Sequence, residues 1–462
     1  MTNTPTAFLA AHRFGFGLAG TKAPGSTGRD ALEHQLAHPE AALIDTPLPT
    51  IEANIRTLVQ INAATAAAQR QAAMEQPAEM AAPRPAGEAP QPRAPVVNVN
   101  TAIILPEFTA RLGRALSGEA DFLERLVVFW SNHFAVSISK GGPVAAAFGP
   151  YERSVIRPGI TGRFADLLLA VTRHPAMLFY LDNQGSIGPN SARGRRQNRG
   201  INENLAREIL ELHTLGVDGG YTQADVTSFA MALSGWSFTP QNAAEPGRFL
   251  FIPGAHEPGP QTVLGKVYPQ EGEAQAEAIL ADLARHPSTA RFIAKKLAAH
   301  FVADEPPPAL VARLATTYTR TDGDLGAVCR ALVASDEAWA PALTKLRSPY
   351  EFVVALHRTV GVQVVRNRMF GMLDNLGQPV LRPPSPAGYS DASADWLAPD
   401  AIKTRADFAM ELAARYNGDA AALARDTLGP ALTDETLTAI RRAESSPQGL
   451  ALLLMSPEFQ RR

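Results

Sequence analysis

The stretch NRGINENLAREILELHTLGVDGGYT, residues 198–222, gathers acidic, amide, guanidinium and imidazole side chains around one predicted helix. Carboxylates and imidazoles transfer protons or bind metal ions, and a guanidinium orients an anion. At about 100° per residue, a helix over 202–215 places Leu205, Ile209 and Leu212 on one face. The polar side chains then share the opposite face, so the spacing predicts a candidate site on this helix.

Part of that polar face has a structural explanation. Glu203 and Glu211 each lie four residues from Arg207, which predicts an ion ladder along the helix surface. Glu208 lies outside the ladder beside Asn204, so it is the carboxylate most readily interpreted as catalytic or metal-binding. Asn204 and Arg207 are candidate substrate-binding side chains. A purely structural ion network is the alternative to a catalytic site.

Two histidines are candidate partners for Glu208. His133 lies in DFLERLVVFWSNHFAV (121–136), which is apolar nearly all round and should be buried, so each polar side chain in it needs a partner. His256 lies in a loop between short β-like runs. Together with Glu208 they form the candidate catalytic set and the candidate ligands of a divalent metal. A satisfied core histidine is the ordinary alternative for His133, and His213 faces the apolar side of its helix.

Arginines cluster directly before the polar helix, in GSIGPNSARGRRQNRG (185–200). Arg193 and Arg199 in this basic loop are candidate anion-binding residues, with a solvated loop as the alternative. The glycines of GFGLAG (15–20) have the dinucleotide-binding spacing but neither a strand before them nor a helix after them, so no nucleotide site is expected. Arg13 beside them is a further candidate substrate-binding residue. Common zinc-protease, zinc-finger and hydrolase-elbow motifs are absent from the sequence.

Composition indicates a soluble globular protein. The chain has 462 residues, of which 45% are hydrophobic and 19% charged, with a net charge of -2, which argues against general nucleic-acid binding. Cys329, the single cysteine, can form no disulfide within the chain. No apolar run reaches the roughly 20 residues of a membrane span, and the N-terminal residues lack the pattern of a signal peptide. A cytoplasmic location is therefore expected, or a periplasmic one by export together with a partner.

Helical periodicity dominates and predicts an all-α fold, one large multi-helix domain over 1–462 with long irregular loops. The helices expected from this pattern cover 50–75, 105–118, 121–136, 161–173, 202–215, 222–235, 272–286, 288–302, 307–320, 324–336 and 346–360. Residues 76–95, rich in Pro and Ala, are expected to form a flexible insertion. The segment 246–270 is expected to hold a small β-hairpin. A further irregular stretch, 375–399, is expected to be anchored by Tyr389 and Trp396.

Six motifs together carry a family resemblance: HRFGFG (12–17), FWSNHF (129–134), PAMLFYLDN (175–183), NENLAREILELHTLGVDGGYTQADV (202–226), LSGWSF (233–238) and HEPGPQTVLG (256–265). They resemble a large bacterial family known as domain of unknown function 1800, from about His12 to SPEFQ (456–460). The resemblance implies one helical unit. It also implies a partner related to alkaline phosphatases and sulfatases, encoded nearby. The family's motif positions in this sequence are Asn132, His133, Asn204, Arg207, Glu208, Glu211, His213, Asp225, Trp236 and His256.

Two functions follow as hypotheses. The first is a metal-assisted or acid/base hydrolase of an anionic or polymeric substrate, with Glu208 as base or ligand and Arg207 orienting an anionic group. Trp236 is a candidate substrate-binding residue in this hypothesis. The second is a non-catalytic assembly or maturation partner of the phosphatase- or sulfatase-like protein. A weaker third is an anion- or glycan-binding module that uses Arg193 and Arg199.

Overall fold

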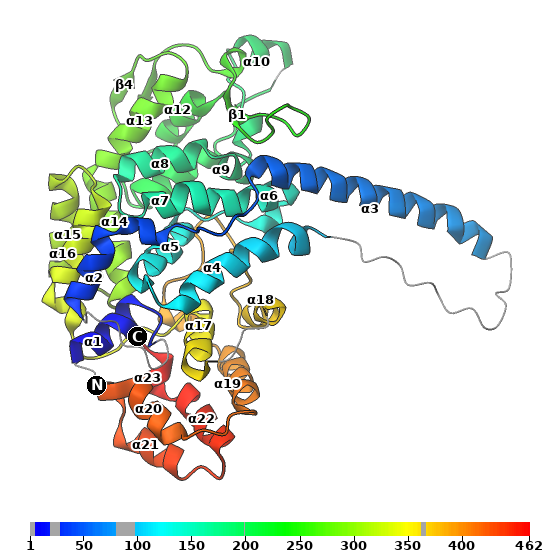
Figure 1. Cartoon of the computed structure of the whole chain (residues 1–462). Helices are drawn as coiled ribbons and strands as arrows, with labels where there is room; N and C mark the ends of the chain where they lie inside the picture. Colours follow the sequence, from blue (N-terminus) through cyan, green and yellow to red (C-terminus); the bar gives the residue numbers. More distant parts are fainter. Residues whose placement is uncertain (1–4, 19–27, 80–97, 198, 362–365) are drawn as a thin grey trace.

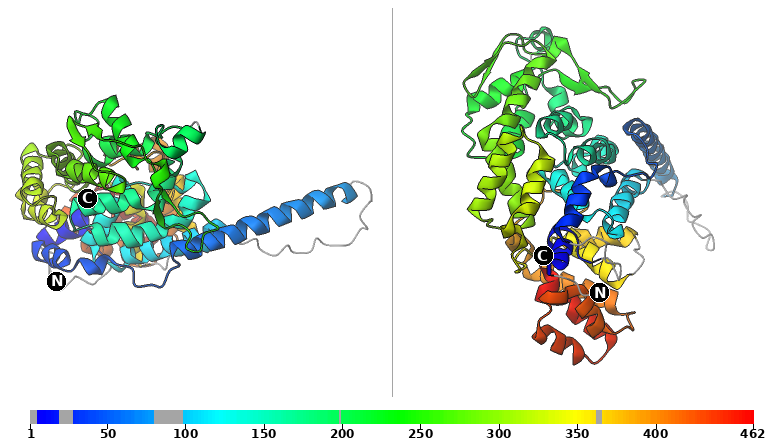
Figure 2. Two further views of the ribbon diagram at one scale, coloured as in Figure 1. Left: turned by 90° about the horizontal axis from the view of Figure 1, so that it is seen from above. Right: turned by 60° about the vertical axis from the view of Figure 1, so that its left-hand side comes forward.

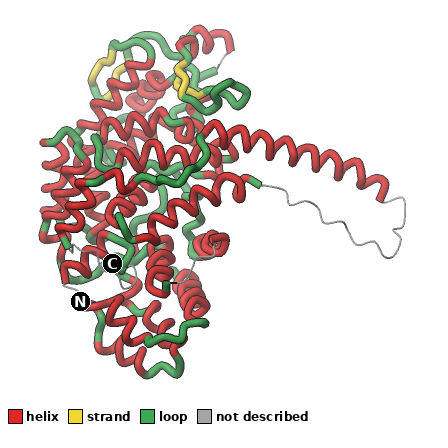
Figure 3. Tube along the Cα trace, in the orientation of Figure 1, coloured by secondary structure: helices red, strands yellow, loops and turns green. Residues whose placement is uncertain are grey.

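The computed structural model describes residues 5–18, 28–79, 98–197, 199–361 and 366–462 (Figure 1). The fold is all-α, as predicted, and Figure 3 shows helices throughout, with two small strand pairs gathered at one end. Residues 80–95 of the expected insertion, and the last two positions of GFGLAG, lie outside the described residues. In the part that is described, a single hydrophobic core runs from Phe8 to Phe459.

The first half of the chain holds α1 (Pro5–Leu9), α2 (Arg29–Ala37), α3 (Ile51–Glu79), α4 (Leu105–Ser117), α5 (Asp121–His133), α6 (Gly142–Tyr151), α7 (Arg157–Gly159), α8 (Phe164–Arg173), α9 (Pro175–Tyr180), α10 (Ala192–Gln197), α11 (Asn204–Glu208) and α12 (Gln223–Leu233). The second half holds α13 (Glu273–Arg285), α14 (Pro287–Phe301), α15 (Pro308–Arg320), α16 (Leu325–Ala334), α17 (Pro349–Val360), α18 (Arg366–Asn375), α19 (Pro399–Ala413), α20 (Ala420–Leu428), α21 (Asp434–Arg441), α22 (Ser446–Met455) and α23 (Pro457–Gln460).

The strands form two antiparallel pairs. β1 (Trp236–Phe238) pairs with β2 (Phe249–Phe251), and β3 (Gln261–Val263) pairs with β4 (Lys266–Tyr268). The hairpin expected within 246–270 is therefore present as β3–β4, and the first pair was not anticipated. In the expected basic loop, α10 forms a short helix that exposes Arg193.

The molecule is elongated, with α12, α13 and the strands at one end and α19–α23 at the other (Figures 1 and 2). Helices α4, α5 and α17 lie between these two ends. The 29-residue helix α3 packs its first turns against α6 and then projects away from the body. Among the described residues, no helix is both long and apolar enough to span a membrane.

Capping explains several helix starts. Thr222 and Asp225 form a capping box at the start of α12, as their spacing predicts. The helix expected to start at 288 begins one residue earlier, at Pro287, because the ring of His286 accepts a hydrogen bond from the Ser288 backbone amide. A second capping box opens α17: the Glu351 carboxylate accepts from the Ser348 backbone amide at 2.9 Å. This cap fixes Glu351 at the centre of the molecule.

The helix expected over 202–215 changes its winding midway. It begins as α11 and continues as a π-helical segment, η7 (Ile209–Thr214), in which the Thr214 hydroxyl bonds the carbonyl of Ile209 at 2.6 Å. A π turn holds more residues than an α turn, so side chains beyond Glu208 rotate away from the positions that a 100° step predicts. The geometry of the predicted ion ladder depends on this difference.

Candidate functional site

Of the two ion pairs predicted for Arg207, the structure contains one. The Arg207 guanidinium pairs with Glu203 at 3.0 Å, with about a third of each side chain exposed (39% and 30%). Glu211 instead accepts a hydrogen bond from the Tyr221 hydroxyl at 3.2 Å. The π turn between Arg207 and Glu211 explains the loss of the second rung. Arg207 is thus engaged in a structural ion pair.

Glu208 remains outside the ion pair, as the sequence indicated. It is half-buried, and among the described residues its carboxylate has no hydrogen-bond or ion-pair partner. Burial, together with the charge of Glu211, raises the pKa of Glu208 above its ordinary value. Asn204 next to it is exposed. Glu208 therefore has the properties of a proton donor or acceptor, and it lies near the surface.

His133 lies among aromatic rings in the core. It is 1% exposed, and its Nε2 meets the carbonyl of His213 at 3.1 Å. The rings of Trp130, Phe134 and His213 lie within 6.1 Å of its ring centre. Burial lowers the pKa of His133 well below its ordinary value, with Lys296 adding to the effect, so the ring is neutral at pH 7. This environment is that of a core histidine.

His256 and its neighbour hold a loop in place. The His256 Nδ1 meets the Ser234 carbonyl at 3.0 Å, and the ring packs edge-on against Phe251. Glu257 is buried and accepts from both the backbone and the side-chain amide of Asn190. The structure describes no group of three or more His, Cys, Asp or Glu side chains placed to hold a metal ion. A metal role for His133, Glu208 and His256 remains a prediction without a geometric counterpart.

The other candidates are scattered over the fold. Arg13 is buried, and its guanidinium donates to the carbonyls of Ala338 and Ala342, each at 2.7 Å. Trp236 is fully buried on β1. Arg193 and Arg199 are exposed. The structure does not bring these side chains together with Glu208 into one pocket.

A different place in the molecule has the form of a binding site. A pocket with a cavity volume of about 90 Å³, here called the central pocket, opens between α4, α5 and α17. Its apolar wall includes Phe108, Val128, Phe148, Leu381 and Trp396. The polar side chains that line it are Arg111, Ser131, Asn132, His300, Ser348, Tyr350, Glu351, Gln378, Tyr389, Ser390, Asp391 and Arg462. Largely apolar walls with a few convergent polar groups are typical of small-molecule sites.

The irregular segment 375–399 forms one side of the central pocket. Asn132 on α5 holds it: the Asn132 side-chain amide donates to the Tyr389 carbonyl at 2.8 Å, and its oxygen accepts from the Tyr389 backbone amide at 2.7 Å. The anchoring expected of Tyr389 and Trp396 is present, and Trp396 is 8% exposed. Asn132, a family motif position, thus closes the pocket instead of facing Glu208.

Gly388 allows this close approach, because its φ is +83° and a Cβ there would lie 2.4 Å from the carbonyl oxygen of Asn132. We expect Gly388→Ala to lower the free energy of unfolding by roughly 2–3 kcal/mol, since it adds backbone strain and a clash. Urea denaturation would measure it. Gly377→Ala is the matched control: φ is also +83° but nothing lies within 4 Å, so about 1 kcal/mol is expected. Equal losses would mean that Gly388 has no special contact with α5.

One polar contact in the pocket resembles a catalytic pair but is engaged on both sides. His300 donates from Nδ1 to Asp391 at 2.8 Å, and its Nε2 accepts from the Arg125 guanidinium at 3.0 Å. Burial lowers the pKa of His300 to about 4. Burial alone would raise the pKa of Asp391, but His300 and nearby lysines outweigh it and hold that pKa at about 2. The imidazole therefore has no free nitrogen with which to accept a proton from a substrate.

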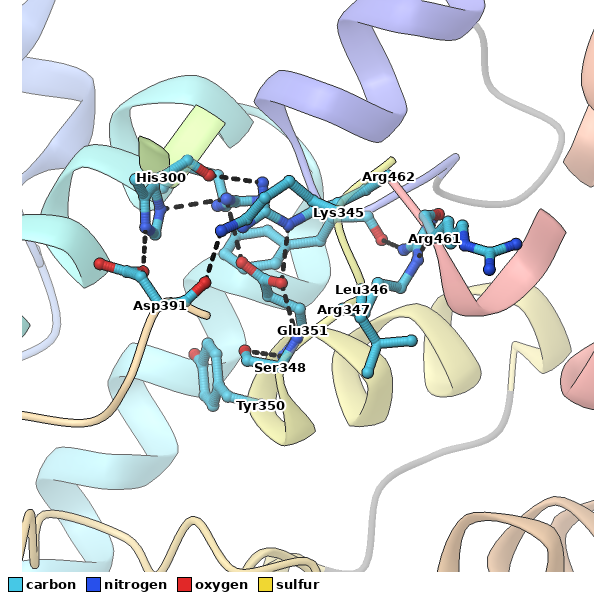
Figure 4. A network of polar contacts seen from close by, with 12 residues as sticks. His300, Lys345, Leu346, Arg347, Ser348, Tyr350, Glu351, Asp391, Arg461 and Arg462 are labelled. Atoms are coloured by element: carbon cyan, nitrogen blue, oxygen red, sulfur yellow. Dashed lines mark hydrogen bonds and ion pairs between the residues drawn. The ribbon is translucent and has the colours of Figure 1, made fainter. Parts of the chain in front are cut away.

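Glu351 is the centre of the buried network behind the pocket (Figure 4). Its two oxygens pair with Arg125 at 2.9 Å and with Arg462 at 2.8 Å, and each of these side chains is at most 3% exposed. Burial would raise the pKa of Glu351, but the two guanidinium groups hold it far below the ordinary value. The Arg462 guanidinium also donates to the His300 carbonyl at 2.7 Å. The network fixes α5, α14 and α17 against one another.

A second ion network reaches the pocket through Arg111. Arg157 pairs with Glu124 at 2.7 Å and with Glu152 at 2.9 Å, and Glu152 also pairs with Arg111 at 3.0 Å. The sequence predicted that Glu124 and Arg125, on the apolar helix 121–136, would need partners, and both have them. Their buried partners were not predictable, because Arg157 lies 33 positions from Glu124 and Glu351 lies on a helix much later in the chain than Arg125.

Tyr350 differs from the other polar groups of the pocket. It is 7% exposed, and among the described residues its hydroxyl has no hydrogen-bond partner. Burial raises its pKa to about 12, so the hydroxyl stays protonated. We expect Tyr350→Phe to leave the unfolding free energy within about 0.5 kcal/mol. In Tyr318→Phe, which removes a hydroxyl bonded to the Ala284 carbonyl at 2.7 Å, about 1 kcal/mol should be lost. Equal losses of stability in thermal denaturation of the two variants would contradict the conclusion that the Tyr350 hydroxyl has no hydrogen-bond partner among the described residues.

The fold is a large all-α fold with a partly apolar pocket at the junction of its helices. The chain belongs to the family described as protein of unknown function (DUF1800), whose model matches residues 9–461. The family resemblance carried by the sequence motifs is thereby confirmed over nearly the full length. Comparison with curated proteins and with solved structures gave no match.

Proposed function

We propose that the chain binds a small, mostly apolar molecule in the central pocket. The observation that carries the proposal is the pocket itself: a cavity of about 90 Å³ between packed helices, bordered by aromatic and aliphatic side chains. The two ion networks support it, because they hold the walls rigid before a ligand arrives, which lowers the cost of binding. The engaged nitrogens of His300 favour binding over catalysis at this place.

A neutral apolar dye, N-phenyl-1-naphthylamine, tests the proposal. We expect saturable fluorescence enhancement with about one site per chain. Val380→Trp, which fills part of the pocket from its loop wall, should weaken binding roughly tenfold or more, about 1.4 kcal/mol or more. Leu250→Trp is the control, because Leu250 is 39% exposed on β2, away from the pocket. Equal affinity of the wild type and both variants would overturn the proposal.

Acid/base hydrolysis is a second candidate, and the observation that favours it is Glu208. A half-buried carboxylate with a raised pKa and no partner among the described residues suits general acid or base chemistry. An anionic or polymeric substrate would lie across the surface beside Asn204. Turnover of p-nitrophenyl acetate, phosphate and sulfate by wild type and Glu208→Gln tests this. The hypothesis predicts activity that is lost in Glu208→Gln and retained in Glu245→Gln, which makes the same change at an exposed carboxylate; equal activity of wild type and Glu208→Gln would reject it.

A non-catalytic partner role is favoured by the projection of α3. Val59 and Met74 on this helix are 42% and 78% exposed. A helix that leaves the body gains little stability from tertiary packing, so it suits a contact surface. The partner inferred from the family resemblance is a phosphatase- or sulfatase-like protein. Co-purification with that protein should be lost in the double variant Val59→Glu, Met74→Glu, while the dye still binds; co-purification at wild-type yield would contradict a role for α3.

A further inference from the structure

The polar groups of the central pocket define the chemistry of its occupant, an inference that rests on the proposed binding function. Two buried donors on the α4 and α17 side have no acceptor among the described residues: the Tyr350 hydroxyl and the Nε of Arg111. Both residues line the pocket, and the Arg111 guanidinium lies 5.4 Å from the centre of the Tyr350 ring. In Figure 4 no dashed line reaches the Tyr350 hydroxyl. An oxygen of a bound ligand would satisfy a donor of this kind.

The charge around the pocket favours a negative ligand. Five arginines are buried in or next to the network around Glu351: Arg13, Arg125, Arg347, Arg405 and Arg462. Within the part of the chain that the structure describes, Glu351 is the carboxylate that pairs with any of them. Arg347 donates instead to the Phe16 carbonyl and to His12, and Arg405 donates to Gln460 and to the Arg347 carbonyl. Because these partners are carbonyl, amide and imidazole groups, Glu351 balances only part of the positive charge of these five arginines.

The remaining walls exclude a strongly polar body. Phe108, Phe148, Val380, Leu381 and Trp396 present carbon surfaces, which burial of an aliphatic or aromatic body stabilises by about 25 cal/mol per Å². A sugar or nucleotide would lose its hydrogen bonds to water there without replacement. The carboxylate of Asp391, which also lines the pocket, disfavours a second negative group. The ligand that fits these walls therefore has one charged end and one apolar end.

We propose that the central pocket binds a free carboxylic acid with an apolar body, whose carboxylate accepts hydrogen bonds from the Tyr350 hydroxyl and the Arg111 Nε. The apolar body lies against Phe108, Val380 and Trp396. Charge-assisted hydrogen bonds from a guanidinium are stronger than neutral ones, so the carboxylate should bind more tightly than an alcohol with the same chain.

Calorimetric titration of octanoate and octan-1-ol into the full chain tests this inference. Octanoate should bind about tenfold more tightly than octan-1-ol. Tyr350→Phe should lower the affinity for octanoate roughly three- to tenfold, since it removes one hydrogen bond to the ligand and leaves the fold intact. Tyr318→Phe removes a buried hydroxyl far from the pocket and should leave octanoate affinity within about twofold. These three results together support the carboxylate site.

The contrary outcomes distinguish a failure of the carboxylate inference from a failure of the proposed pocket binding. If octan-1-ol binds as tightly as octanoate, or if Tyr350→Phe leaves octanoate affinity unchanged, the carboxylate inference is wrong and pocket binding stands. If the neutral dye binds at the pocket but octanoate does not, the conclusion is the same. If the dye, octanoate and octan-1-ol all fail to bind, the proposed function fails together with the inference.

Discussion

Glu351→Gln is expected to lower the free energy of unfolding by about 3–5 kcal/mol, because it leaves two buried guanidinium groups without a counter-charge. In the wild type, Glu351 meets Arg125 at 2.9 Å and Arg462 at 2.8 Å, and all three side chains are nearly inaccessible to solvent. Gln keeps the shape of the side chain and removes its charge. Urea denaturation followed by circular dichroism would measure the loss.

The matched control is a pair of the same type at the surface. Arg248 and Glu245 form an ion pair at 2.6 Å with 74% and 61% of their side chains exposed. Because water screens such a pair, Glu245→Gln should change stability by less than about 0.5 kcal/mol. A loss in Glu351→Gln no larger than this control would show that the Glu351 network does not hold the helices together.

Acidification is expected to produce the second large effect. Burial lowers the pKa of His174 and of His213 to about 3, and that of His300 to about 4. The same groups titrate near 6.5 in the unfolded chain. Below pH 6.5 the unfolded chain therefore binds more protons, and stability falls as the pH falls through the window from about 6.5 to about 3. Each histidine contributes about 1.4 kcal/mol per pH unit within its window.

Urea denaturation at pH 7.5, 6.5 and 5.5 measures this dependence. Stability should be nearly constant between the first two values and should fall steeply at the third. His213→Leu supplies the control, since both ring nitrogens of His213 are buried without a partner among the described residues. This variant should show a shallower decline below pH 6.5. An unfolding free energy that stays flat from pH 7.5 to 5.5 would contradict the neutral, buried state of these histidines.

Local patterns predicted the helices well, because helix periodicity and capping are encoded within a few residues. The start of α12 follows from Thr222 and Asp225, and the ion pair of Glu203 with Arg207 follows from their spacing. The π turn η7 was not predictable from a fixed 100° step, so the expected contact of Arg207 with Glu211 was wrong. One extra residue in a turn is enough to separate two side chains.

The central pocket depends on contacts that are distant in the chain. Arg111, Asn132, Tyr350 and Asp391 come from segments that only the tertiary fold brings together. The sequence held partial signals: the need of Arg125 for a partner, and the aromatic anchors of the segment 375–399. The sequence also indicated Glu208 as a candidate, because its polar neighbours lie on the same predicted helix. Spacing along one helix could not indicate a pocket built from segments that are far apart in the chain.

Trp396 reports directly on whether the central pocket takes up an apolar ligand. Trp396 lines the pocket, and it is one of four tryptophans in the chain. Titration with 8-bromooctan-1-ol, whose bromine quenches indole fluorescence on contact, is the measurement. We predict saturable quenching that disappears in Trp396→Phe. Quenching that rises linearly without saturation, or that is the same in Trp396→Phe, would contradict the claim.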